Sequence, residues 1–599
     1  MSNYILAEIK DKLSNLHEGD QRQLEVVFSS NPRIIVEAPA GYGKTTTMVS
    51  RIAYLYVTGG IPNPKKVLGL TFSVNAALKI KREVAEKLPV LLGVSNNPVA
   101  VGDRVTVTNF HGFCKGVLKK YGYLISDMLR RDINMMKGVG ISEIEKRNDL
   151  KRLFSVDELA ALQQIERDIS RSHMPSMEDI QHYNDIVLSK LIPKDYITHD
   201  AVILMTIQLF EFHEEIKKFY SNYYPLIVVD EFQDTNCMAW ELLKSIITHK
   251  TQLLFLGDSL QRIYGFIGAL PEIMNVAAEE FHMQAISLDK NYRFRNNPEM
   301  LILDYNVRAN AANNFAPDKL TDATLPSFWG KTQDEEATLV LAEIKRLKEK
   351  HPEKKFAILF RSRGENAIVY EKKLLASKIP YFYGMFTDDD PEYVDFHAFC
   401  RDEFTKRFGR KRLLSKRNLV DFAKRVKETY SAKDKKAADS LIELLFAQIN
   451  KVSVDYADLQ TEEKYDLLLD IFENRQLKQA MEYIQSNLLL STVHGAKGLE
   501  WDYVFIGDLE RMAFPGFYTC NKCVNQFSKM SQCRCVLPKK VNESFLNVML
   551  DELSVFYVAL TRARRQVYVA ASGLKANNKD SIFSCMASLR GIKIVDASK

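Results

Sequence analysis

Residues 34 to 46 read Ile-Ile-Val-Glu-Ala-Pro-Ala-Gly-Tyr-Gly-Lys-Thr-Thr. A short apolar strand leads into a glycine-containing loop, and a helical pattern begins at the lysine. Glycines let such a loop wrap until its backbone N–H groups point at phosphate oxygens, and the helix adds its positive N-terminal end. In this pattern Lys44 reaches the β- and γ-phosphates, and Thr45 places its hydroxyl on Mg²⁺. The stretch predicts a P-loop with Ala38 at the usual first-glycine position; a chance Gly-Lys-Thr turn is the competing interpretation.

A second segment supplies the acids that a P-loop needs beside it. Four apolar residues, 226 to 229, are typical of a buried strand and end at Asp230 and Glu231. Asp230 is placed to bind Mg²⁺, and Glu231 is placed to polarise the attacking water. The two segments together predict a chain that hydrolyses a nucleoside triphosphate.

Strand-like and helical patterns alternate along the rest of the chain. Strands separated by helices predict parallel α/β sheets. Two long polar segments, about 114–223 and 385–485, have a helical period and are predicted to be helical insertions. The strands are predicted near residues 34–36, 67–70, 226–229, 253–256, 356–360, 503–506 and 567–570.

The composition is that of an ordinary globular protein. Its 599 residues are 46% hydrophobic and 26% charged, which suggests about four structural units. The net charge of +6 is a mild bias toward anionic partners. The N-terminus lacks the apolar core of a signal peptide, and no apolar run is long enough to span a membrane. With eight cysteines in so long a chain, we expect a cytoplasmic protein without membrane contact.

The segment from Asp230 to Asn236 reads Asp-Glu-Phe-Gln-Asp-Thr-Asn, which resembles the Walker B signature of the UvrD, Rep and PcrA family of superfamily 1 DNA helicases. Ala38 is also that family's usual residue. The resemblance implies an α/β fold of two RecA-like parallel-sheet motor domains with helical insertions. It places the first domain at 1–113 and 224–285, with its insertion at 114–223. The second domain is expected at 286–384 and 486–599, with a short insertion at 385–485.

Seven further segments resemble family motifs in the family's order. They imply ATP-binding residues, which are Gln21, Ala38, Gly41, Gly43, Lys44, Thr45, Thr46, Tyr292 and Glu500. The catalytic residues implied are Lys44, Asp230, Glu231, Gln261, Arg293 and Arg562. The DNA-binding residues implied are Thr71, Phe72, Asn75, Phe110, His111, Tyr264, Phe266, Thr492 and His494.

The resemblance also implies how these groups act together. Arg293 and Arg562 belong to the second domain, so each is expected to reach the γ-phosphate across an interdomain cleft. Such an arginine finger is worth about 10³–10⁵ in rate. Exposed aromatic rings hold single strands by stacking on bases. Phe72, Phe110, Tyr264 and Phe266 are candidates for this. Each could instead be a core residue, and for Phe72 and Phe110 the two interpretations are equally favoured.

Three features depart from the family pattern or add to it. Phe266-Ile267-Gly268 stands where the family has Trp-Arg-Gly, and Ser259 and Leu260 replace acids of the same motif. These changes bear on the coupling of hydrolysis to unwinding more than on hydrolysis itself. A basic stretch, Lys406 to Lys427, could bind phosphates or form a solvated helix face.

Half of the cysteines lie within sixteen residues, at Cys520, Cys523, Cys533 and Cys535. A CxxC pair beside a CxC pair can enclose Zn²⁺ tetrahedrally. We therefore expect a zinc-binding lobe at about 516–540, with an iron–sulfur cluster or free thiols as the alternatives.

The resulting expectation is an ATP-dependent single-stranded DNA translocase or helicase, 3′-to-5′ by family resemblance, that acts on single-stranded or tailed DNA. The alternative is a DNA-sensing ATPase subunit that regulates a partner nuclease, for example in anti-phage defence.

Overall fold

The structure is a computed structural model that describes residues 3–93, 104–263, 269–270, 272–387, 390–408, 413–430, 435–457, 459–523, 543–574 and 581–598. The chain forms two compact units, Met1–Lys290 and Asn291–Lys599, called unit 1 and unit 2 below. The division after Lys290 falls close to the expected domain boundary at residues 285 and 286.

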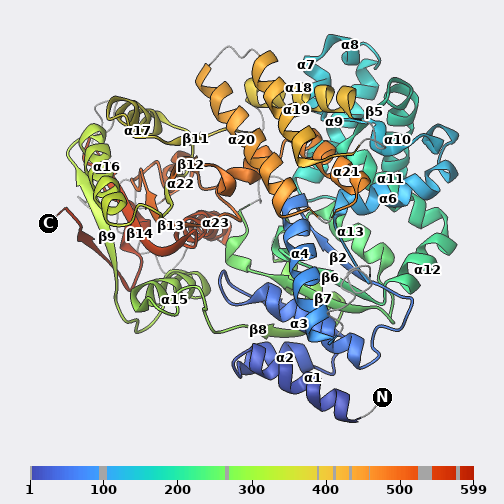
Figure 1. Cartoon of the computed structure of the whole chain (residues 1–599), viewed down its shortest axis with the longest axis horizontal. Helices are drawn as coiled ribbons and strands as arrows, with labels where there is room; N and C mark the ends of the chain where they lie inside the picture. Colours follow the sequence, from blue (N-terminus) through green and yellow to red (C-terminus); the bar gives the residue numbers. More distant parts are fainter. Residues whose placement is uncertain are drawn as a thin grey trace. The chain divides into compact units, whose positions relative to one another are not determined.

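Unit 1 is built on a parallel sheet (Figure 1). Within the described residues the sheet has six strands in the order β3-β2-β6-β7-β1-β8. The strands are β1 (Arg33–Glu37), β2 (Val67–Thr71), β3 (Val105–Asn109), β6 (Leu226–Val229), β7 (Gln252–Gly257) and β8 (Gln284–Ser287). All neighbouring pairs run parallel, as the alternation of strand and helix patterns predicts.

Helices cover both faces of this sheet because its strands are apolar on both faces. Ile34 and Val36 join a core that includes α3 and α4, whereas Ile35 points into a core that includes α6, α11 and α13. Such two-sided burial is typical of a parallel sheet. The helices around the sheet are α1 (Asn3–Leu16), α2 (Gln21–Phe28), α3 (Lys44–Val57), α4 (Val74–Leu91), α6 (Phe110–Tyr121), α13 (Cys237–Ile246) and α14 (Ile273–Glu280).

The segment expected to be a helical insertion in unit 1 is mainly helical. Its helices are α7 (Ile141–Lys146), α8 (Asn148–Lys151), α9 (Val156–Ser170), α10 (Met177–Lys190), α11 (His199–Phe212) and α12 (Glu214–Tyr223). The structure adds a parallel pair of three-residue strands, β4 (Lys137–Val139) and β5 (Tyr196–Thr198). The helix α11 is buried along almost its whole length, so it forms the centre of this part of the core.

Unit 2 contains a second parallel sheet (Figure 1). Among the residues that the structure describes, its seven strands follow the order β11-β12-β10-β13-β14-β9-β15. They are β9 (Ala323–Gly330), β10 (Phe356–Phe360), β11 (Phe382–Gly384), β12 (Leu488–Thr492), β13 (Trp501–Ile506), β14 (Ala563–Ser572) and β15 (Ile592–Asp596). Two parallel α/β units confirm the predicted fold class.

The helices of unit 2 fall into two groups. Those connected with the sheet are α15 (Pro298–Ala312), α16 (Gln333–Lys350), α17 (Glu365–Ala376), α22 (Phe517–Lys522) and α23 (Glu543–Leu560). The segment expected to be the second insertion contains α18 (Pro391–Arg407), α19 (Lys416–Thr429), α20 (Lys435–Val454) and α21 (Thr461–Glu473). No helix among the described residues is long and apolar enough to cross a bilayer.

The strand order of unit 1 places three chemistry-bearing loops side by side. The strands β6, β7 and β1 are neighbours and parallel, so their carboxyl ends meet at one edge of the sheet. The loop after β1 is the predicted P-loop, β6 ends at Asp230, and β7 ends at Gly257. Ligands of open α/β sheets bind at such an edge.

Candidate functional site

The loop between β1 and α3 has the backbone of a phosphate cradle. Gly41 and Gly43 adopt left-handed φ angles of 86° and 82°, which only glycine adopts readily. A Cβ atom on Gly43 would lie 2.4 Å from Nε2 of Gln23, so space as well as conformation requires glycine there. Ala38 donates its backbone N–H to the carbonyl of Gly257, 2.7 Å away, and is buried. The strand, loop and helix predicted from the sequence are all present.

Lys44, the first residue of α3, contacts both acids that follow β6. Its Nζ lies 3.1 Å from Oδ1 of Asp230 and 2.5 Å from Oε1 of Glu231. Burial alone would lower the pKa of Lys44, but Asp230 and Glu231 outweigh it and raise that pKa. Burial raises the pKa of Asp230 against the opposing charge of Lys44. The lysine therefore stays charged, and the three groups lie where one phosphate chain and its metal can bind.

Glu231 is held in an uncommon conformation. Its φ of 56° lies in the left-handed region, which is rare for a residue other than glycine and concentrates at functional sites. Its second carboxylate oxygen accepts a hydrogen bond of 2.6 Å from Nε2 of Gln233. Gln233 in turn accepts the backbone N–H of Asp258 at 3.0 Å. The segment after β6 is thus tied to the segment after β7.

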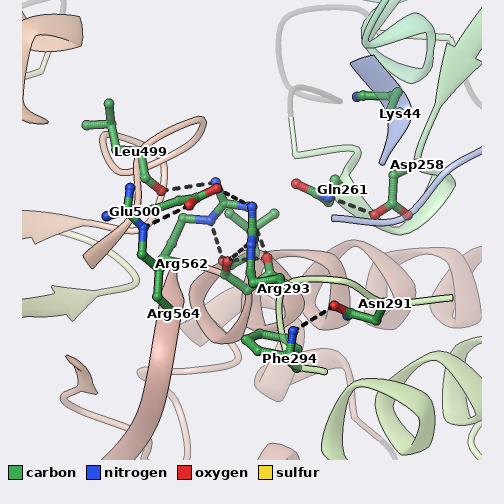
Figure 2. A network of polar contacts seen from close by, with 12 residues as sticks. Lys44, Asp258, Gln261, Asn291, Arg293, Phe294, Leu499, Glu500, Arg562 and Arg564 are labelled. Carbon is green, nitrogen blue, oxygen red and sulfur yellow. Dashed lines mark hydrogen bonds and ion pairs between the residues drawn. The ribbon is translucent and has the colours of Figure 1, made fainter. Parts of the chain in front are cut away.

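Gln261 is fixed by that neighbouring segment. Its Nε2 donates to Oδ2 of Asp258 at 2.7 Å, while Oδ1 of Asp258 accepts the backbone N–H of Leu260 at 3.2 Å (Figure 2). Gln261 and Asp258 are both buried. The side chain of this predicted catalytic residue is therefore preorganised within unit 1.

The residues present fit a magnesium ion bound with a nucleotide. Mg²⁺ prefers carboxylate, hydroxyl and phosphate oxygens, and Asp230 and Thr45 supply the first two types from the end of β6 and the first turn of α3. Gly43 beside them has no space for a side chain, because a Cβ there would clash with Gln23. Thr46, also predicted to bind ATP, has a different contact: its hydroxyl accepts a hydrogen bond of 3.1 Å from Lys87.

In unit 2 the carboxylate of Glu500 interacts with three arginines. Glu500 accepts hydrogen bonds from Arg293 and, at 3.1 Å, from Arg564 (Figure 2). Burial alone would raise the pKa of Glu500, but the charges of Arg293, Arg562 and Arg564 outweigh it and lower that pKa. The register of β13 and β14 explains the meeting, because Trp501 pairs with Ala563 and so brings their preceding residues together.

Arg562 is held mainly by main-chain carbonyls of its own unit. Its guanidinium donates to Val558 O at 3.0 Å, to Leu499 O at 3.2 Å and to the hydroxyl of Thr561 at 3.0 Å. Arg293 is less enclosed and also donates to Thr561 O at 2.5 Å. Both predicted fingers therefore start from fixed positions within unit 2.

The residues before Arg293 form a short anchored turn. The side chain of Asn291 accepts the backbone N–H of Phe294 at 3.0 Å (Figure 2). Tyr292, predicted to bind ATP, lies between these two anchored residues and is half-buried.

Comparison with known proteins agrees with this geometry. Residues 20–282 match the model of the UvrD/REP helicase N-terminal domain, and residues 398–573 match that of the UvrD-like helicase C-terminal domain. The chain belongs to the UvrD/REP helicase family. It is accordingly an ATP-dependent DNA helicase by class.

Several curated relatives resemble this helicase over much of its length. A probable DNA helicase II homolog of Mycoplasma genitalium is 24% identical over 93% of this chain and 85% of its own. A homolog of the same description from Mycoplasma pneumoniae is 24% identical over 89% of this chain and 81% of its own. The ATP-dependent DNA helicase PcrA of Staphylococcus aureus is 26% identical over 61% of this chain and 50% of its own.

The helicase has a glutamine against its P-loop that the sequence analysis passed over. Gln21, predicted to bind ATP, is exposed and donates to Gly19 O at 3.2 Å. Gln23, two residues on, is buried, and its Nε2 donates to Tyr42 O in the P-loop at 2.9 Å. Its Oε1 accepts a hydrogen bond from His17. Because α2 begins at Gln21, a shift of two residues moves a side chain to another face of the helix.

Gln23→Ala is expected to weaken ATP binding about threefold to tenfold, because one buried hydrogen bond to the P-loop is lost. Gln21→Ala serves as the matched control and should leave binding unchanged. Titration of a fluorescent ATP analogue measures both affinities. Loss of binding in Gln21→Ala but not in Gln23→Ala would restore the assignment made from sequence.

The predicted strand-binding residues of unit 1 are divided between core and surface. Phe110 is only 3% exposed and packs against the half-buried Phe72, with ring centroids 4.9 Å apart. Thr71 is completely buried at the end of β2. The core interpretation therefore holds for Phe110 in this structure, and Phe72 keeps a partly accessible ring.

The other predicted DNA contacts are placed as follows. His111 lies half-buried in the first turn of α6, edge-on to His199 with ring centroids 6.4 Å apart. In unit 2, Thr492 ends β12, and its hydroxyl accepts the backbone N–H of Gly495 at 3.1 Å. His494 is half-buried in the turn that follows. Tyr264, Phe266 and the side chain of Asn75 lie outside the described residues.

The predicted zinc lobe is described only at its start. Cys520, at the end of α22, accepts the backbone N–H of Met512 at 3.3 Å, and both Cys520 and Cys523 are buried. Cys533 and Cys535 lie outside the described residues. No group of three or more His, Cys, Asp or Glu side chains suited to a metal occurs in the part that is described, so the zinc site stays a prediction.

Proposed function

We propose that this helicase hydrolyses ATP at the P-loop of unit 1 and uses the cycle to move 3′-to-5′ along single-stranded DNA. The observation that carries the proposal is the meeting of Lys44, Asp230 and Glu231 beside the glycine cradle. These groups come from loops on neighbouring strands, and together they are the parts that phosphoryl transfer needs.

Each side chain then has a distinct task. Lys44 leaves its acid partners and binds the β- and γ-phosphates. Glu231 accepts the proton of the attacking water, and Gln261 contacts the γ-phosphate. Thr45 and Asp230 would hold Mg²⁺, which supplies positive charge to the phosphate oxygens when bound.

The arginines of unit 2 complete the proposed chemistry. Arg293 and Arg562 reach the nucleotide bound at unit 1, as the family resemblance implies, and Glu500 keeps Arg293 oriented before that step. Hydrolysis then depends on domain closure, and such closure is a general means of coupling a chemical step to movement. Tyr292 is proposed to stack on the adenine. Gln23, which contacts the P-loop, is proposed as the ATP-binding glutamine in place of Gln21.

The preference for single strands rests on the half-buried Phe72 and on the aromatic positions 264 and 266 of the sequence. Stacking on bases is worth about 1–3 kcal/mol per base, and paired bases within a duplex are closed to it. We further propose that 114–223 and 385–485 are insertions into the two motor domains. A structural zinc at the four clustered cysteines is proposed from the sequence alone.

The proposal predicts strong stimulation of ATPase activity by single-stranded DNA and weak stimulation by blunt duplex. Strand displacement should occur on duplexes with a 3′ tail and not on those with a 5′ tail. ATPase and displacement assays on the three substrates measure this directly. Phe72→Ala should reduce displacement more than hydrolysis, because a stacking ring is lost while the phosphate contacts remain.

Two results would contradict the proposal in different ways. Equal stimulation of ATPase activity by blunt duplex and by single strands would reject the single-strand motor. It would favour the alternative function, a DNA-sensing ATPase that regulates a nuclease. Displacement from 5′ tails alone would reverse the assigned polarity and leave the ATPase site standing.

A further inference from the structure

Glu37, the last residue of β1, makes two hydrogen bonds to a single residue of the segment after β7. Its Oε1 accepts the backbone N–H of Ser259 at 3.0 Å, and its Oε2 accepts the hydroxyl of Ser259 at 2.7 Å. Both carboxylate oxygens thus bind Ser259, which lies 222 positions further along the sequence. The contact is possible because β1 and β7 are neighbours and Glu37 pairs in register with Gly257.

The partner sits at the start of the short helical turn that carries Gln261. Ser259 is the first residue of that turn, Ser259–Gln261, and Asp258 caps it. A carboxylate that accepts an N–H at the start of a helical turn makes a charge-assisted hydrogen bond, which is shorter and stronger than a neutral one. Glu37 therefore fixes the first residue of the turn, while Asp258 fixes its backbone and the Gln261 side chain.

The same network extends to Glu231. Asp258 donates its backbone N–H to Gln233, and Gln233 donates to Glu231. Glu37 immediately precedes the P-loop. Because Asp258 and Ser259 are adjacent in the chain, these hydrogen bonds together join the entrance of the P-loop, the segment after β7 and the proposed base.

The contact between Glu37 and Ser259 occurs at a position where the sequence departs from the family pattern. The family resemblance implies acids after the aspartate of this motif, and here Ser259 and Leu260 stand in their place. A negative charge nevertheless lies against the turn, because Glu37 brings it from the adjacent strand.

We propose that Glu37 is a positioning residue for ATP hydrolysis, acting through Ser259 to hold Gln261 and, through Gln233, Glu231 in their productive geometry. This inference rests on the proposed ATPase site. The two hydrogen bonds of Glu37 act on the turn that carries Gln261 and not on the phosphate cradle, so its effect is expected on turnover and not on nucleotide affinity.

Glu37→Ala should lower the DNA-stimulated kcat about tenfold and leave the dissociation constant of ATP within about twofold of wild type. Glu37→Gln should retain most of the activity, because its carbonyl still accepts the N–H of Ser259 and its amide can donate to the hydroxyl. Ser259→Ala should lower kcat less than Glu37→Ala does. In the double variant the two effects should not add, since both remove the same contact.

Glu280→Ala, which changes an exposed acid on α14 of the same unit, is the matched control and should have no effect. Wild-type kcat in Glu37→Ala, a loss confined to ATP affinity, or full additivity with Ser259→Ala would each overturn the inference. If Glu37→Ala does not fold, Ser259→Ala and Glu37→Gln test the same contact with smaller changes. Lys44→Ala distinguishes failure of the proposed ATPase site from failure of the proposed role of Glu37. Hydrolysis that survives this change refutes the ATPase site itself.

Discussion

Replacing Glu231 with glutamine is expected to lower ATP turnover by about 10²–10⁴-fold, the usual contribution of a general base. Glu231 is the acid that lies beside the P-loop lysine and has a second oxygen held by Gln233. Glutamine keeps the shape of the side chain but cannot accept the proton of the attacking water. The phosphate cradle is untouched, so the affinity for ATP should change only about twofold.

Steady-state ATPase assays with saturating single-stranded DNA, together with equilibrium nucleotide binding, measure the two quantities. Glu280→Gln alters an exposed acid of the same unit in the same way and should behave as wild type. Turnover above about one tenth of wild type in Glu231→Gln would show that another group is the base.

Arg562→Ala is expected to lower turnover by about 10³–10⁵-fold, the effect of losing an arginine finger. The structure adds a second expectation, because Arg562 is 3% exposed and donates to two main-chain carbonyls. Removing the guanidinium takes this donor from the carbonyl of Leu499, and a buried acceptor left unsatisfied costs about 1–3 kcal/mol. The carbonyl of Val558 still accepts the hydroxyl of Thr561. Unit 2 should therefore unfold at a lower temperature in this variant.

Arg564→Ala provides a matched control. Arg564 lies two residues away and pairs with the same Glu500, but it is 54% exposed, and exposed ion pairs contribute little to stability. It should retain most of the turnover and the melting temperature. Assays well below the melting temperature separate chemistry from folding. A folded Arg562→Ala protein with wild-type turnover would refute the proposed role of unit 2 in hydrolysis.

The phosphate loop could be predicted from sequence because its determinants are local. Gly41 and Gly43 are needed for their backbone angles, and the apolar run before them and the helix after them are defined within a few residues. Asp230 and Glu231 likewise follow directly from the strand that precedes them. The short strands β4 and β5 lie inside a segment of helical period and gave no distinct signal.

Other assignments stayed open because they depend on which side chains the packing of the chain turns inward. Gln21 and Gln23 are equally polar and lie two residues apart, yet packing of α2 buries Gln23 alone. Phe72 and Phe110 both belong to family-like motifs, and only burial shows that Phe110 is a core residue. Composition cannot distinguish these cases, because a ring or an amide can occupy either environment.

The sequence by itself determined the two α/β units, the phosphate loop and the acids beside it, since glycine conformation, strand period and motif spacing are properties of short segments. Only the tertiary structure decided that Glu37 meets Ser259 and that Glu500 gathers Arg293 and Arg564. These contacts join residues more than sixty positions apart. They follow from strand order and register, which depend on how the whole chain packs its apolar faces.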